Sequence, residues 1–128
     1  MVVQFQTRQH EPDVTSMEFT GQLTLGNSLV EVEHAIKDRI QAGCRKLVLD
    51  LMNLSFLDSA GLGVLVVCSS VMEQAGGRLA VVGAGGKVKQ VLEITHVNKV
   101  IGMYPDLASA LARLAELPTP AADASTMA

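Results

Sequence analysis

The segment DSAGLG at 58–63 holds the side chain best placed for chemistry, the hydroxyl of Ser59. A serine hydroxyl can act as a nucleophile if a base lies within hydrogen-bond reach and an oxyanion hole is present. It can also accept a phosphoryl group. The segment differs from the Gly-x-Ser-x-Gly pattern of a nucleophile elbow, and the histidines stand far away in the sequence, at His10, His34 and His96. A small serine hydrolase is thus the less favoured alternative. Ser59 can still be a phosphoacceptor, or an ordinary serine at the start of a helix.

Other motifs give weaker signals. The segment GAGGK at 83–87 is similar to a phosphate loop, but Val88 stands where such a loop has Ser or Thr. A strand-to-helix turn that needs positive φ is the favoured interpretation. The two cysteines, Cys44 and Cys68, form no Cys-x-x-Cys pair, which argues against a structural zinc site and fits a reducing compartment. We therefore expect no metal site and no cofactor.

The composition predicts one domain with an aliphatic core, because the chain has 128 residues, 48% of them hydrophobic and only 3% aromatic. The formal net charge is −3 and the charges are scattered, unlike the basic stripe of a nucleic-acid-binding protein. No apolar run reaches the length of a membrane span, and the N-terminus lacks the pattern of a secretory signal. We expect a cytoplasmic protein that binds no nucleic acid and does not insert into a membrane.

Apolar periodicity predicts strands that alternate with helices. The expected strands are at 2–6, 15–23, 46–50 and 79–82, with a short one inside 97–103, and the expected helices are at 28–41, after Asp58, at 88–94 and at 106–114. Turns are expected at 9–13 and around Asn53, and Gly21 indicates a bulge or a close backbone approach. This order predicts an α/β fold with a small, mixed, mostly parallel sheet of four to five strands and about four helices. Its strand-to-helix loops should share one edge.

The helix after Asp58 is apolar almost all round over its first three turns. Asp58 stands at the position of an N-cap. A helix that is apolar on all sides must be covered on more than the face toward the sheet. Either neighbouring helices cover it, or part of its N-terminal half is a surface for a partner.

The segment LSFLDSAGLG at 54–63, preceded by the strand at 46–50, resembles the signature of the STAS domain family, the bacterial anti-sigma factor antagonists and their relatives. The resemblance covers about 14–114 and includes GQL at 21–23, the glycine pair at 76–77 and the helix at 106–114. It implies a STAS-type α/β fold, with a single STAS domain at 1–117. The prolines at 118 and 120 and the small residues after them predict a disordered tail at 118–128.

In that family, the serine at the position of Ser59 is phosphorylated by a partner kinase that is also the anti-sigma factor. The resemblance implies a binding module rather than an enzyme. The unphosphorylated protein would bind the anti-sigma factor serine/threonine kinase and release the sigma factor, and phosphorylation of Ser59 would end the binding. A Ser/Thr phosphatase is a further candidate partner. The partner-binding residues implied are Thr24, Asp58, Ser59, Gly61, Leu62 and Gly63.

Two positions depart from the family pattern. Ala60 stands where many members have a second serine, and Thr24 where many have an acidic residue. Ser59 is therefore the only hydroxyl within 58–63. An alternative with the same fold is a docking subunit of a lipid-transport or stress-signalling complex that does not use a phosphorylation switch.

Overall fold

A computed structural model describes residues 3–11 and 13–116. Its core is one five-stranded sheet in the order β1-β2-β3-β4-β5. The strands are β1 (Val3–His10), β2 (Val14–Leu23), β3 (Lys46–Leu57), β4 (Arg78–Val82) and β5 (Gly102–Tyr104). β1 and β2 form an antiparallel hairpin, and the remaining pairs are parallel. The predicted small, mixed, mostly parallel sheet is confirmed.

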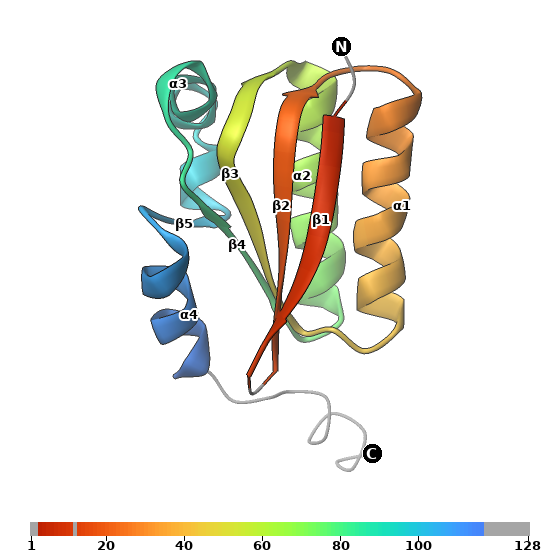
Figure 1. Ribbon diagram of the computed structural model, residues 1–128, viewed down its shortest axis with the longest axis vertical. Coiled ribbons are helices and arrows are strands. Elements are labelled where there is room, and N and C mark those ends of the chain that lie inside the picture. The colour runs from red at the N-terminus through yellow and green to blue at the C-terminus, as the bar shows by residue number, and fades with distance from the viewer. Residues whose placement is uncertain (1–2, 12, 117–128) are drawn as a thin grey trace.

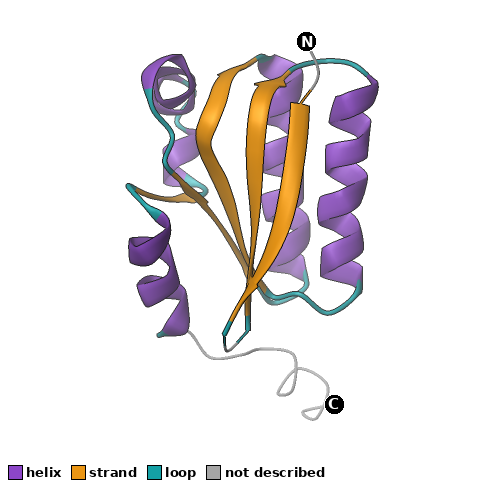
Figure 2. Ribbon diagram, in the orientation of Figure 1, coloured by secondary structure: helices purple, strands orange, loops and turns teal. Residues whose placement is uncertain are grey.

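Within residues 3–11 and 13–116, four helices and one 3₁₀ turn connect or follow these strands. They are α1 (Asn27–Gln41), α2 (Ser59–Gln74), α3 (Gly86–Ile94), the 3₁₀ turn η1 (Val97–Lys99) and α4 (Leu107–Ala115). α1 and α2 lie side by side behind the sheet in Figure 1, and Figure 2 shows the strands in front of them. The predicted helix start at Asp106 is confirmed, because its carboxylate accepts a hydrogen bond from the backbone N–H of Ser109 at 2.8 Å.

The sheet is apolar on both faces because successive side chains point to opposite sides. Leu47, Leu49 and Leu51 join the main core under α1 and α2. Val48, between them, belongs to a smaller cluster with Leu114 of α4 on the other face. The apolar run that begins β3 is therefore the signature of a strand covered on both sides.

The predicted C-terminal end of the third strand was wrong. β3 does not end near Asp50 but continues through Asn53 to Leu57, because β2 supplies partners for this part of the strand. The Asp50 carboxylate accepts from the N–H of Met52 at 3.0 Å. Because β4 ends opposite Asp50, the part of β3 after Asp50 pairs with β2 but not with β4, and polar residues are tolerated there. The predicted turn around Asn53 is thus overridden by strand pairing.

β1 also runs further than predicted, to His10, whose Nε2 lies 2.8 Å from the hydroxyl of Ser16 on β2. The last strand is Gly102–Tyr104, and η1 occupies the start of the segment where that strand was expected. The bulge expected near Gly21 is confirmed, since the β2–β3 register shifts between Gly21 and Gln22. The predicted disordered tail at 118–128 lies outside the described residues.

Candidate functional site

Loops that follow β2, β3 and β4 lie toward the same edge of the sheet, as expected for right-handed crossovers (Figure 1). The loop after β2 is joined directly to the start of α2. The backbone N–H of Leu25 donates to Oδ2 of Asp58 at 3.0 Å, and the N–H of Asp58 donates to the carbonyl of Leu23 at 3.2 Å. Thr24, one of the predicted partner-binding residues, is half-buried in this loop.

Asp58 is the N-cap of α2, as predicted. Its Oδ1 accepts from the N–H of Gly61 at 2.9 Å, while Oδ2 accepts from Leu25. These backbone hydrogen bonds, first from Gly61 and then from Leu25, hold the pKa of the Asp58 carboxyl below its ordinary value. Both carboxylate oxygens are therefore used to fasten the helix start to the β2–α1 loop.

Ser59 is the first residue of α2 and its side chain is exposed. Within the described part of the chain, its hydroxyl makes no hydrogen bond. The hydroxyl lies at the positive end of the helix dipole, where added negative charge is tolerated. This geometry leaves Ser59 open to an enzyme or a partner that approaches from solvent.

The two glycines of the segment have different surroundings. A Cβ at buried Gly61 would lie 2.1 Å from the carbonyl oxygen of Leu23, so this position requires glycine for the close contact between α2 and β2. Gly63 is exposed, and a Cβ there would meet nothing within 4 Å. The fold thus explains Gly61, and it gives no packing reason for Gly63.

Exposed apolar side chains lie in the loop that is bonded to Asp58, at the end of β3 before Ser59, and further along α2. Leu25 is 81% exposed, Val67 45%, and Phe56 and Val66 37% each. Leu62, predicted to contact a partner, is half-buried. We call the following residues the loop-edge surface: Leu25, Phe56, Ser59, Leu62, Gly63, Val66 and Val67.

Sequence reasoning missed Leu25 and Phe56. A signal was present for Leu25, since a large apolar residue in a loop next to Gly26 has no helix or strand face to bury it. Phe56 gave no such signal, because an apolar residue near the end of a strand is usually buried. Of the two interpretations left open for α2, cover by a neighbouring helix is confirmed, since α1 packs beside it. The partner surface stays a prediction, and the exposed Val66 and Val67 are available for it.

Other candidates are not brought to this site. His10 lies at the hairpin end of β1 and is engaged by Ser16. The glycine loop before α3 does use positive φ, +72° at Gly83 and +54° at Gly86, as predicted for a turn. Among the described residues, no group of three or more His, Cys, Asp or Glu is arranged to hold a metal ion. No helix in this part of the chain has the length and apolar character needed to cross a membrane.

Comparison with known proteins finds a family whose sequence pattern matches most of this chain. The family model for the STAS domain matches residues 5–110. The anti-sigma F factor antagonist of Paenibacillus polymyxa is 30% identical over 109 residues, which cover 83% of this chain and 91% of that protein.

Solved structures agree in fold. The crystal structure of an anti-sigma factor antagonist from Mycobacterium paratuberculosis superposes with a TM-score of 0.78 at 23% identity, covering 89% of this chain and 95% of that one. The Bacillus cell fate determinant SpoIIAA in its phosphorylated form superposes with a TM-score of 0.69 at 18% identity, covering 86% and 98% of the two chains.

Proposed function

The chain belongs to the STAS domain family and groups there with anti-sigma factor antagonists, and we propose that it binds an anti-sigma factor kinase until Ser59 is phosphorylated. In the unphosphorylated state it occupies the kinase and so releases a sigma factor. Phosphorylation of Ser59 ends this binding, and a Ser/Thr phosphatase restores it. The protein then acts as a binding module in the cytoplasm.

The observation that carries this proposal is the free, exposed Ser59 hydroxyl beside exposed apolar side chains. A phosphoryl group there adds about −1.5 to −2 charges. The N-terminus of α2 favours the added charge by roughly 0.3–1 kcal/mol. Asp58 opposes it by about 1.5–2 kcal/mol if the charges lie about 4 Å apart in water. The net cost is at most about 2 kcal/mol, which is small against a typical unfolding free energy of about 5–15 kcal/mol, so the fold should persist after modification.

The effect on a complex is much larger. Contact between the loop-edge surface and a partner would remove water from the phosphate, and an unpaired buried charge costs several kcal/mol. Since about 1.4 kcal/mol corresponds to a factor of ten in affinity, phosphorylation should weaken binding by about a hundredfold or more. The switch therefore acts on the interface and leaves the fold intact.

The first experiment is incubation with the candidate kinase and ATP, followed by mass spectrometry of the intact protein and its peptides. We expect one phosphate on Ser59 and none on the Ser59→Ala variant. Binding without any phosphate on Ser59 would contradict the switch and support the docking-only alternative.

The second experiment measures affinity by calorimetry. Ser59→Asp should bind the kinase at least about tenfold more weakly than wild type. A matched control is Ala108→Asp, which places a carboxylate in the exposed first turn of α4, another helix capped by an aspartate. Equal affinity of Ser59→Asp and wild type would refute the proposal, as would equal losses in both variants.

A further inference from the structure

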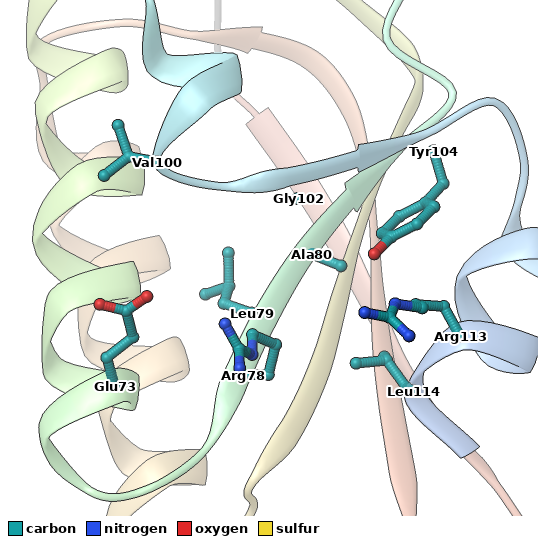
Figure 3. Close-up of a pocket in the computed structure, with 9 residues that line it drawn as sticks. All are labelled: Glu73, Arg78, Leu79, Ala80, Val100, Gly102, Tyr104, Arg113 and Leu114. Carbon is teal, nitrogen blue, oxygen red and sulfur yellow. The ribbon is translucent and has the colours of Figure 1, made fainter. Parts of the chain in front are cut away.

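A concave site lies on the β5 side of the sheet, away from the loop-edge surface. It is a cavity of about 130 Å³ lined by residues of α2, β4, β5 and α4. Figure 3 shows the hydroxyl of Tyr104 and the guanidinium of Arg113 on one side, Glu73 on the other, and Arg78 between them. Arg78 is the first residue of β4, whereas Ser59 follows the carboxyl end of β3.

Arg113 already has an ion-pair partner within the described residues, whereas Arg78 does not. The guanidinium of Arg113 donates to the carboxylate of Glu116 at 3.1 Å in an exposed ion pair. The side chain of Arg78 makes no hydrogen bond or ion pair within the described residues. Guanidinium groups donate in a planar fork that matches a carboxylate or a phosphate. The site thus offers a free fork from Arg78, a second guanidinium and a phenol hydroxyl.

The size of the cavity limits what can enter. Pockets that hold drug-sized ligands and cofactors are about 300–1,000 Å³. A cavity of about 130 Å³ admits a single small group, such as one oxyanion at the end of a side chain. A nucleotide or another large cofactor is too big for it.

The charges select the kind of oxyanion. The lining carries guanidinium groups on Arg78 and Arg113 and a carboxylate on Glu73. Because Glu116 already pairs with Arg113, Arg78 is the lining guanidinium that has no ion pair within the described residues. A carboxylate, with charge −1, matches this one positive charge. A phosphate dianion would leave an excess negative charge beside Glu73. We propose that this pocket binds the carboxylate of an Asp or Glu side chain in an extended segment of a partner protein.

The neighbouring strand edge supports a peptide. β5 pairs only with the second part of β4, from Ala80 to Val82, so Arg78 and Leu79 lie on β4 before β5 begins. Extended peptides bind beside such strand edges, with alternate side chains entering pockets. Val100 also lines the cavity and is 61% exposed, which offers an apolar contact to a residue next to the acidic one.

The test is an NMR titration of the full chain with the capped peptide acetyl-Val-Glu-Val-amide, observing backbone amides and arginine Nε–Hε groups. The matched probe is acetyl-Val-Gln-Val-amide, which has the same shape and no charge. Inorganic phosphate is titrated separately. The variants are Arg78→Gln and Arg113→Gln, and Arg39→Gln is the control because it removes an exposed guanidinium on α1, away from the cavity.

We expect saturable shifts at Arg78, Val100, Tyr104 and Arg113 with the Glu peptide, at a dissociation constant in the millimolar range. The Gln peptide, Arg78→Gln and Arg113→Gln should each weaken binding about tenfold or more, which corresponds to about 1.4 kcal/mol, and Arg39→Gln should have no effect. Equal binding of the two peptides would overturn the proposal. It would also be overturned by an unaltered affinity in Arg78→Gln, or by phosphate binding more tightly than the Glu peptide.

Discussion

Replacement of Gly63 by alanine should change the stability of the fold and the affinity for a partner in opposite directions. The new methyl group would meet nothing within 4 Å, and the position lies inside α2, where glycine is about 0.5–1 kcal/mol less favourable than alanine. Gly63→Ala should therefore stabilise the isolated protein by about 0.5–1 kcal/mol. For a chain of this size, that corresponds to a rise of about 2–5 °C in Tm.

The same methyl group should weaken the complex. The proposed interface contains Gly63 beside Ser59 and Leu62, and glycine allows another backbone to come close. Additional methyl groups in well-packed contacts typically cost about 1–3 kcal/mol, equivalent to a loss of about fivefold to a hundredfold or more in affinity. Gly63→Ala is thus expected to be more stable and to bind its kinase less tightly.

Gly61→Ala is the paired variant. Its methyl group would overlap the carbonyl of Leu23, so α2 or β2 must shift. The expected loss of stability is about 1–3 kcal/mol, even after the helix preference for alanine is included.

The assays are urea unfolding for stability and calorimetry with the kinase for affinity. Two results would refute the reasoning about Gly63: a destabilised Gly63→Ala protein, or one that is stabilised and binds with wild-type affinity. If Gly63→Ala kept wild-type affinity but Ser59→Asp lost binding, the proposed interface would still be supported. Only the close approach of the partner at Gly63 would then be wrong.

Three further predictions concern single ionisable groups. The folded-state pKa of Asp58 lies below its ordinary value of 3.8, so its stabilising effect is present above that pH and is lost as the pH falls through the folded pKa. Urea unfolding of Asp58→Asn should therefore show a flatter acid limb than wild type. Near neutral pH it should show a loss of about 1 kcal/mol, because Asn keeps the cap acceptor for Gly61 but has an NH₂ group in place of the oxygen that accepts from Leu25. Burial raises the pKa of the Cys68 thiol to about 11, so a thiol reagent at pH 8 should label Cys44 readily and Cys68 only after denaturation; rapid labelling of both would contradict this. Nζ of the buried Lys46 lies 3.2 Å from Oδ2 of Asp13, so Asp13→Ala should lower the free energy of unfolding by about 3 kcal/mol, and a change below about 1 kcal/mol would count against this ion pair as a stabilising contact.

Structural features that depend on residues close together in the sequence, such as helix caps and bulges, were predictable. Asp58 and Asp106 cap helices through N–H groups three residues further on, and such caps depend on local residue types. The bulge at Gly21 was also visible, because glycine inside a strand pattern has few other uses.

Features set by distant partners were not predictable. Asn53 favours a turn locally, yet pairing with Thr20 keeps it in β3. The exposure of Phe56 depends on which part of the sheet the helices leave uncovered. Arg78, Tyr104 and Arg113 come together only through the packing of β4, β5 and α4, and periodicity along the chain contains no information on such convergence.

In the proposed switch, the neighbours Asp58 and Ser59 have different roles at the start of α2. The carboxylate of Asp58 already accepts from the N–H groups of Gly61 and Leu25. A phosphate on Ser59 could gain these donors only by displacing Asp58, which would release the link between α2 and the β2–α1 loop. The phosphate should therefore stay toward solvent, where a partner would meet it. Because the donors are occupied in advance, modification of Ser59 can change binding without rebuilding the helix start.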